Sequence, residues 1–318
     1  MKAMLLRELA GPQAIERAEL PDPAGEGVLI EVRAAGICYP DLLVTHGRYQ
    51  VQMQPPFVPG SEVSGVVLTA PDDSGFRPGE RVSAMTNQGG YAERVLVPPA
   101  VVRKLPRSLD FADGAALLAN HHTAHFALYR RAGLVAGETV LVLGAAGGVG
   151  SAAIQVAKAL GARVLAGVRR SGHDEFLRGL GADEVTALGE GWRERVGELT
   201  GRGVDIVVDP VGGEVFDDAV RVLAPEGRLL VLGFAGGAIP RIKVNRLLLR
   251  NVSIVGAGWG EFLRTHPEAL AETAGALETL VDKGLRPPVT RRYPLEQASR
   301  ALADLEEGRI VGKAVLTV

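Results

Sequence analysis

Hydrophobic and polar residues alternate in short runs over the first third of the chain, from Met1 to about Leu118. Turn sequences rich in Gly and Pro separate these runs, among them Pro71–Gly75 and Arg77–Glu80. A period of two residues is typical of half-buried strands. Many short strands joined by such turns indicate a small antiparallel barrel or sandwich. The predicted strands are Met1–Leu6, Val28–Ala34, Val63–Thr69, Arg81–Met85, Tyr91–Val97 and Val101–Lys104.

The pattern changes from about Phe111, where short apolar runs begin to alternate with segments of helical spacing. This alternation is typical of a doubly wound parallel sheet whose strands are covered by helices on both faces. Six such strands predict the order 3-2-1-4-5-6, with a ligand at their carboxyl ends. The predicted strands are Thr139–Leu143, Arg163–Val168, Glu184–Ala187, Val204–Val208, Arg228–Gly233 and Val252–Gly256. The predicted helices between them are Ser151–Leu160, Asp174–Leu180, Trp192–Thr200, Gly213–Leu223 and Val244–Leu249.

The last part of the chain predicts two helices, over Pro267–Lys283 and Leu295–Glu306, and a final strand, Val311–Val318. A strand so far from the doubly wound half is expected to rejoin the N-terminal barrel. The fold class is therefore α/β with two domains. A barrel domain is expected over residues 1–118, completed by 259–318, and a nucleotide-binding domain over 119–258.

A glycine-rich turn lies between the first strand and the first helix of the doubly wound half. One glycine permits the tight turn, one lets backbone N–H groups approach a pyrophosphate, and the last lets the helix pack against the strand. The phosphates then lie at the positive end of the helix dipole. The turn therefore predicts a dinucleotide site. Its expected cofactor-binding residues are Gly144, Ala145, Ala146, Gly147, Gly148, Val149 and Gly150.

Two further loops follow later strands of the same sheet. Asp209–Gly213 follows the fourth strand, and Gly233–Ala235 follows the fifth. Because the carboxyl ends of parallel strands meet at one edge, both loops should face the glycine-rich turn. The expected cofactor contacts from these loops are Val211, Gly212, Gly233, Phe234 and Ala235.

Arg169 and Arg170 follow the second strand, where an NAD enzyme usually carries an Asp or Glu for the ribose hydroxyls. An acid there would repel a 2′-phosphate, whereas a guanidinium can hold it with two parallel hydrogen bonds. The alternative is that both arginines only solvate the loop. The missing acid and the paired arginines together favour NADPH over NADH.

Charge and composition exclude several classes of function. The chain of 318 residues has a net charge of −2, which gives no electrostatic reason to bind nucleic acid or an acidic membrane. The uncharged stretch Thr139–Ala157 is too rich in glycine to be a membrane-spanning helix. Arg7 and Glu8 interrupt the N-terminal apolar run, so a cytoplasmic protein is expected. The single cysteine, Cys38, allows neither an internal disulfide nor a four-cysteine zinc lobe.

Five segments carry a resemblance to a known family. They are Gly36–Asp41, Gly47–Tyr49, Pro59–Gly65, the glycine-rich turn and Gly312–Leu316. In this order they resemble the medium-chain dehydrogenase/reductase superfamily, and within it the zinc-free NADPH:quinone oxidoreductases. The resemblance covers the full length and implies a GroES-like N-terminal domain and a Rossmann domain. It also implies a homodimer through the edge strand Val252–Gly256, whose free backbone groups would pair with a second copy.

The zinc ligands of the alcohol-dehydrogenase-like members are only partly present in this sequence. The resemblance aligns their first ligand with Cys38 and retains a Glu at Glu62. It places Ser61 where a His precedes that Glu, and Ala119 at a third ligand position, four residues before Thr123. A catalytic zinc needs three protein ligands, so no metal is expected. Cys38 is then a buried small residue or a pocket-lining thiol.

Without zinc, the expected reaction is hydride transfer to a quinone or an α,β-unsaturated carbonyl compound, which spreads the incoming charge on to oxygen. The protein then has to position the acceptor, exclude water and offer a hydrogen-bond donor. The resemblance places Tyr49 in the substrate cleft beside Cys38, where its hydroxyl could donate to the carbonyl oxygen; hydrophobic packing is its alternative role. Further expected pocket residues are Tyr39, Phe57, His122 and Trp259, and further expected cofactor contacts are Thr123 and Lys313.

Two other functions stay open at this point. Crystallin-type relatives in the superfamily suggest a non-catalytic NADPH-binding protein. A zinc-dependent alcohol dehydrogenase would need a rearranged site made of Cys38, Glu62 and a histidine from the segment 121–125.

Overall fold

The computed structural model describes all residues from Met1 to Val318, which form two compact units. The first unit comprises Met1–Asn120 and Leu270–Val318, and the second comprises His121–Ala269. The chain therefore passes between them after residue 120 and after residue 269, whereas the sequence suggested residues 118 and 258. The second boundary lies later because the helix Trp259–Thr265 packs within the second unit.

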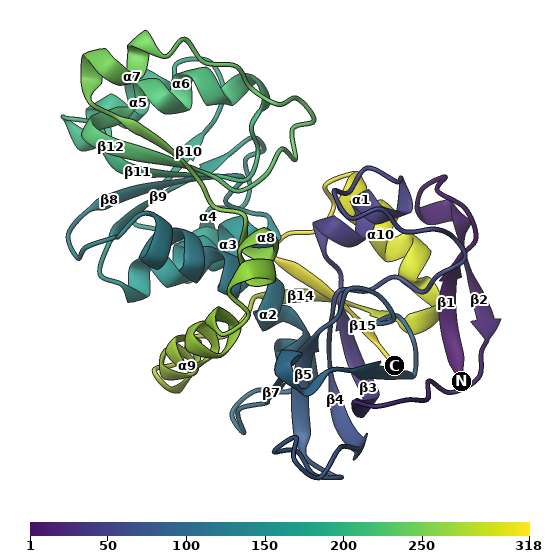
Figure 1. Ribbon diagram of the computed structural model, residues 1–318. Helices are drawn as coiled ribbons and strands as arrows, with labels where there is room; N and C mark the ends of the chain where they lie inside the picture. The colour runs from purple at the N-terminus through teal and green to yellow at the C-terminus, as the bar shows by residue number, and fades with distance from the viewer. The chain divides into compact units, whose positions relative to one another are not determined.

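Strands form most of the first unit (Figure 1). They are β1 (Lys2–Leu6), β2 (Ile15–Glu19), β3 (Val28–Gly36), β4 (Glu62–Thr69), β5 (Arg81–Met85), β6 (Arg94–Val97), β7 (Val102–Lys104), β14 (Val289–Pro294) and β15 (Lys313–Thr317). One seven-stranded sheet has the order β14-β15-β3-β4-β5-β7, with β6 also paired to β3, and β1 and β2 form a separate pair. The C-terminal strand β15 pairs antiparallel with β3, so the end of the chain rejoins the N-terminal sheet as the sequence predicted.

The alternation in β3 explains how this sheet is buried. Val28, Ile30 and Val32 are at most 1% exposed, whereas Leu29 and Glu31 between them are partly exposed. Successive side chains of a strand point to opposite faces, so one face of β3 enters the core. Burial of an Ile or Val side chain contributes about 1.5–3 kcal/mol. The helical elements of this unit are η1 (Pro12–Ala14), α1 (Tyr39–Thr45), η2 (Pro99–Val101), α9 (Ala269–Asp282), η5 (Leu295–Gln297) and α10 (Ala298–Glu306), together with the first part of α2 (Phe111–His125).

The second unit contains a six-stranded parallel sheet. Its strands are β8 (Thr139–Leu143), β9 (Arg163–Val168), β10 (Glu184–Ala187), β11 (Val204–Asp209), β12 (Leu223–Val231) and β13 (Ser253–Gly256). They lie in the order β10-β9-β8-β11-β12-β13, which is the predicted 3-2-1-4-5-6 order. β13 therefore lies at one edge of the sheet, as expected.

Helices cover both faces of this sheet. They are α3 (Gly148–Ala159), α4 (Asp174–Gly179), α5 (Trp192–Thr200), η4 (Gly213–Val215), α6 (Phe216–Arg221), α7 (Asn245–Arg250) and α8 (Trp259–Thr265). Figure 1 shows α5, α6 and α7 on one face and α3 and α4 on the other. No helix of the protein combines the length and apolar character needed to cross a membrane.

Several elements differ from the predicted ones. β12 begins at Leu223, where the sequence suggested the end of a helix, because Gly227 lets the chain continue as an irregular strand beside β11. The short elements β2, α1, α8 and β14 were not predicted from the sequence. After α2, the chain continues as a π-helical turn, Phe126–Arg131, designated η3. Such turns interrupt regular helical spacing and are difficult to predict from hydrophobic periodicity.

Candidate functional site

The glycine-rich turn after β8 leaves the N-terminus of α3 open. Gly144 has a positive φ of 58°, a conformation that glycine adopts without strain, and its carbonyl accepts a hydrogen bond from the Gly147 amide at 2.9 Å. Gly147 is the N-cap residue of α3, and no side chain caps it. The first N–H groups of a helix have no partner within the helix, so they can bind an anion here.

Gly150 is required for the packing of this turn. A β-carbon on Gly150 would lie 2.7 Å from the Ala145 Cα, and one on Gly144 would lie 2.9 Å from a methyl group of Val211. The turn therefore packs against the loop after β11, so two of the predicted cofactor loops lie together at the carboxyl ends of the strands. The Ala145 amide also donates to the Gly167 carbonyl at 3.1 Å, which ties the turn to β9.

The loops after β11 and β12 are held together by backbone hydrogen bonds. The Ala235 amide donates to Pro210 at 3.1 Å, and the Gly236 amide donates to Val211 at 2.8 Å. A β-carbon on Gly212 would lie 3.0 Å from the Phe234 ring. The structure thus brings Val211, Gly212, Phe234 and Ala235 to the same edge as the glycine turn, next to Gly233.

Asp209 shapes the first of these loops. It is only 1% exposed, and its Oδ1 accepts hydrogen bonds from the amides of Val211 and Gly212, both at 2.8 Å. Burial raises the pKa of the Asp209 carboxyl, although these two hydrogen bonds oppose the shift. Sequence reasoning placed the loop correctly but did not give Asp209 this role. An Asp directly before Pro and Gly is the signal for such a side-chain-held turn.

Arg169 and Arg170 lie directly after β9, and both are exposed. They therefore lie at the carboxyl edge of the sheet, in the segment that precedes α4. His173, the N-cap residue of that helix, follows them. Thr123 lies in the second unit within α2, one residue after His122.

A buried polar cluster lies in the first unit, where the resemblance aligns the zinc ligands of the metal-binding members with this sequence. The Lys313 Nζ lies 2.5 Å from Glu62 Oε1 and 3.0 Å from Cys38 Sγ, and the thiol lies 3.1 Å from the same carboxylate oxygen. The side chains of Glu62 and Lys313 are 0% and 3% exposed. The suggestion that Lys313 contacts the cofactor is therefore corrected, because its ammonium is buried and paired with Glu62.

Asp41 and Tyr91 extend this cluster. Asp41 Oδ2 accepts hydrogen bonds from the Tyr91 hydroxyl at 2.9 Å and from the Cys38 amide at 3.1 Å. Burial raises the pKa of the Asp41 carboxyl to about 6, and burial likewise raises the pKa of the Cys38 thiol and the Tyr91 phenol. No motif around Tyr91 singled it out, and its side chain is completely buried.

The predicted pocket residues of the first unit fall into different environments. Tyr49 is partly buried against the core, and burial, followed by the Asp41 carboxylate, raises the pKa of its phenol. Tyr39 begins α1 and is 37% exposed. Phe57 is 8% exposed and belongs to the hydrophobic core near Leu6, so its assignment to the pocket is corrected to a core residue.

His122 and Trp259 lie together in the second unit. Their ring centroids are 6.0 Å apart, and Trp259 also lies 5.2 Å from Phe126. Both side chains are buried, and the indole Nε1 of Trp259 has no hydrogen-bond acceptor. Phe262 on α8 continues the stack at 4.8 Å from Phe126. Phe126 and Phe262 were not predicted, because an aromatic residue in an apolar helix gives no specific signal.

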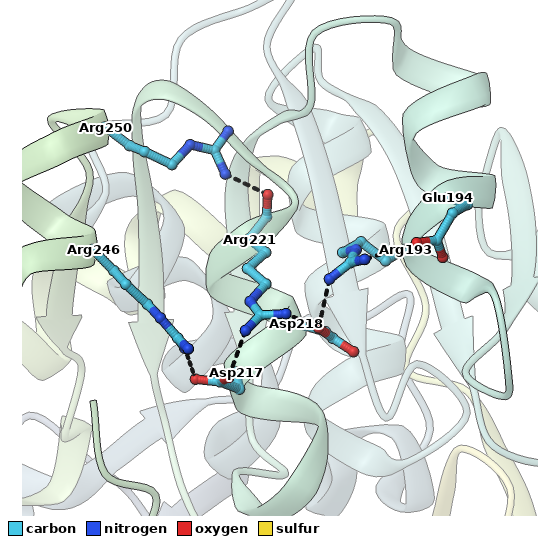
Figure 2. Close-up of polar contacts among 7 residues, drawn as sticks. All are labelled: Arg193, Glu194, Asp217, Asp218, Arg221, Arg246 and Arg250. Atoms are coloured by element: carbon cyan, nitrogen blue, oxygen red, sulfur yellow. Dashed lines mark hydrogen bonds and ion pairs between the residues drawn. The ribbon is translucent and has the colours of Figure 1, made fainter. Parts of the chain in front are cut away.

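A shallow cavity of about 330 Å³ also opens in the second unit, between the β10–α5 loop and α6. Its arginines, Arg193 and Arg221, are both engaged in ion pairs with Asp218 (Figure 2). Asp217 pairs with Arg221 and Arg246, so the network joins α5, α6 and α7. The cavity is lined by two arginines and by four carboxylates, those of Glu190, Glu194, Glu214 and Asp218, so its lining is acidic overall. It is separate from the glycine-rich turn.

The residues available for zinc do not form a metal site. Of the ligand positions that the resemblance identifies, Ser61 and Ala119 offer no ordinary zinc ligand, and an ammonium group contacts Cys38 and Glu62. No group of three or more His, Cys, Asp or Glu side chains in the protein is arranged to hold a metal ion. The donor set therefore does not fit zinc.

A Rossmann unit with an open glycine turn, joined to a barrel-like unit, is the architecture of two-domain dehydrogenases. Residues 24–107 match the family model of the alcohol dehydrogenase GroES-like domain, and residues 148–275 match that of the zinc-binding dehydrogenases. Among similar proteins, the Bos taurus quinone oxidoreductase-like protein 2 is 35% identical, over 100% of this chain and 92% of its own length.

Solved structures agree with these matches. A structure described as a probable oxidoreductase from Mycobacterium abscessus is 53% identical, with a TM-score of 0.92 over 100% of this chain and 99% of its own. The quinone oxidoreductase of Thermus thermophilus, also solved in complex with NADPH, is 35% identical, with a TM-score of 0.87 over 100% of both chains. The chain belongs to the quinone oxidoreductase family of the medium-chain dehydrogenase/reductases.

Proposed function

We propose that this protein uses NADPH to reduce a quinone or an α,β-unsaturated carbonyl compound without a metal ion. The observation that carries the proposal is the open N-terminus of α3 at the same sheet edge as Arg169 and Arg170. These groups suit the pyrophosphate and the 2′-phosphate of NADPH, respectively. The NADPH complex of the Thermus thermophilus relative supports the same cofactor.

The residues of the second unit would bind and orient the cofactor. When bound, NADPH supplies the hydride. The first amides of α3, from Gly148 to Gly150, would hold the pyrophosphate. The interlocked loops around Val211 and Phe234 would fix the nicotinamide half, because they follow the strands on that side of β8. Precise orientation of this kind is a large part of catalysis when no covalent intermediate is needed.

The first unit would supply the hydrogen-bond donor for the acceptor. Tyr49 is half-buried near Asp41 and Cys38, and its raised pKa keeps the phenol protonated at neutral pH. A protonated hydroxyl can stabilise the negative charge that develops on a carbonyl oxygen. Cys38 is a buried thiol with a raised pKa, so it contributes shape to this region and no nucleophile.

The test is NADPH consumption by the purified protein with a panel of quinones and enones, before and after treatment with a chelator. Turnover that survives the chelator is expected. Tight NADPH binding without turnover of any acceptor would favour a non-catalytic NADPH-binding protein. Activity that is lost with the chelator and restored by zinc would favour a metal-dependent alcohol dehydrogenase.

We also propose that the protein is a homodimer formed through β13. This strand is at the edge of its sheet and leaves backbone groups for pairing with a second copy. The neighbouring segment exposes four large apolar side chains, each at least 73% accessible: Ile239, Val244, Leu248 and Leu249. Exposed apolar side chains gathered in one segment are typical of an interface.

A further inference from the structure

The pairing of Lys313 joins three segments that are far apart in the sequence. Lys313 is the first residue of β15, Glu62 is the first residue of β4, and Cys38 directly precedes α1. The two shortest contacts run from the ammonium to Glu62 Oε1 at 2.5 Å and to Cys38 Sγ at 3.0 Å. All three side chains are at most 3% exposed.

The cluster has a complete set of hydrogen-bond partners around Glu62. Oε1 accepts from the ammonium and from the thiol, and Oε2 accepts from the Ala119 amide at 2.8 Å. Gly36 makes room for the carboxylate, since a β-carbon there would lie 2.4 Å from Glu62 Oε1. A buried carboxylate needs both a counter-charge and hydrogen bonds, and this one has them.

The buried charges of Glu62 and Lys313 balance each other. The ammonium of Lys313 is the counter-charge of the Glu62 carboxylate at 2.5 Å, and the Cys38 thiol donates to the same oxygen at 3.1 Å. Asp41 lies beside this pair and accepts hydrogen bonds from the Cys38 amide and the Tyr91 hydroxyl. Without the ammonium, the Glu62 carboxylate would be buried without its counter-charge.

We propose that Lys313 is an internal cation that takes the place of a metal ion in this protein. Its ammonium contacts the Cys38 sulfur and a Glu62 carboxylate oxygen, the atoms that could coordinate a metal ion. Cys38 and Glu62 are the two groups that the resemblance retains from the metal-binding members. A metal ion approaching these atoms meets a like charge that is already bound. The same contacts hold β15, β4 and the loop before α1 together, and this loop leads to Tyr39 and Tyr49.

This inference rests on the proposed function only where it links Lys313 to a metal-free reaction. The place of Lys313 can be tested by itself with Co²⁺, because cobalt bound to a cysteine thiolate gives a charge-transfer absorption band. We expect the wild-type protein to show no such band. Lys313→Met removes the ammonium, and combining it with Ser61→His adds an imidazole where the metal-binding members carry one. The double variant should change from no uptake to one thiolate-bound cobalt per chain.

Two further variants serve as controls. Lys104→Met removes a surface lysine that pairs with Glu80, and it should leave the spectrum unchanged. Glu62→Gln combined with Lys313→Met removes both charges of the pair, so it should be markedly more stable to urea than Lys313→Met alone. This comparison applies even when the single variant is poorly folded.

Two outcomes would overturn the inference. One is a wild-type protein that binds cobalt through Cys38, seen as a band that Cys38→Ser abolishes. The other is a charge-neutral double variant that is no more stable than Lys313→Met. A wild-type protein that remains metal-free but reduces no acceptor would instead contradict the proposed function and leave the place of Lys313 intact.

Discussion

A β-carbon on Gly150 would lie 2.3 Å from the carbonyl oxygen of Gly144. No real β-carbon tolerates that distance, so any side chain at Gly150 must displace the backbone of the turn that opens α3. Gly150→Val is therefore expected to abolish NADPH binding, measured by titration of NADPH fluorescence, while the first unit keeps its fold.

The matched control for this change is Gly179→Ala. Gly179 lies in α4 of the same unit, and a β-carbon added there would have nothing within 4 Å of it. Alanine is favoured over glycine in a helix by about 0.5–1 kcal/mol, so this variant should bind NADPH normally. Unchanged NADPH affinity in Gly150→Val would remove the glycine turn from the cofactor site.

The raised pKa of Asp41 predicts how stability depends on pH. A carboxyl whose pKa rises from 3.8 to about 6 on folding stabilises the protein fully below pH 3.8, and this contribution is lost as the pH rises through about 6. The shift corresponds to about 3 kcal/mol. Asp41→Asn retains an acceptor for Tyr91 and Cys38 but cannot ionise, so it should be more stable than the wild type near pH 7.

Urea unfolding of both proteins between pH 4 and pH 8 tests this effect, since the two stability profiles should diverge as the pH rises. Asp304→Asn is the contrasting control. The pKa of Asp304 is lowered through its contacts with Tyr293 and Arg309, so the advantage of the wild type over this variant is lost only below about pH 4 and should stay nearly constant from pH 4 to pH 8. Parallel stability profiles for the wild type and Asp41→Asn would mean that folding does not raise the pKa of Asp41.

The sequence predicted the second unit better than the first for a physical reason. β8 and β9 are buried apolar runs whose ends are marked by charged residues or glycine, so hydrophobicity alone defines their bounds. α1 escaped prediction because Tyr39-Pro40-Asp41 resembles a turn, whereas Pro40 occupies the first turn of the helix and Cys38 and Asp41 form its capping box.

The pairing of Lys313 with Glu62 could not be predicted from local pattern, because it joins residues far apart in the chain whose proximity depends on the order of strands in the sheet. One signal was present. A lysine at the start of an apolar strand, Lys313–Thr317, is a candidate for a buried and paired charge. The ligands lost at Ser61 and Ala119 were readable from the sequence, but the group that replaces the metal was not.

The exposed segment beside β13 predicts the oligomeric state. Leu248→Glu together with Leu249→Glu places two charges on side chains that are 74% and 78% exposed, so the variant should fold as a monomer while the wild type is a dimer. Light scattering at micromolar concentration measures both masses. Val135→Glu, at another exposed apolar position of the same unit, should leave the dimer intact. A monomeric wild type would contradict the interface.

Tyr49→Phe tests the proposed donor in the first unit. Loss of one preorganised hydrogen bond to a developing oxyanion lowers kcat roughly 10²-fold. The variant should keep its affinity for NADPH, since only the acceptor step is affected. Tyr129→Phe changes a hydroxyl that is on a 61% exposed side chain of the second unit and should have no effect. An unchanged kcat for Tyr49→Phe would assign Tyr49 to packing alone.

The final prediction concerns the choice between NADPH and NADH. The two cofactors differ only in the 2′-phosphate, and Arg169 and Arg170 follow β9 at the edge where that group is expected. Each hydrogen bond between charged groups contributes about 1.5–3 kcal/mol, and exposure of both arginines lowers that value. One or two such bonds give a preference of roughly tenfold to a few hundredfold. Arg169→Ala with Arg170→Ala should therefore raise the KM for NADPH by this factor and leave the KM for NADH nearly unchanged.

An acidic residue at position 169 should change the cofactor preference more than alanine does. Arg169→Asp adds repulsion toward the 2′-phosphate and a partner for the ribose hydroxyls of NADH, so it should invert the preference. Arg178→Ala removes an arginine from α4, where it contacts Asp183 and Glu184, and it provides the control for a general loss of positive charge. Equal losses of affinity for both cofactors in the double alanine variant would show that Arg169 and Arg170 hold the loop after β9 in place and do not bind the phosphate.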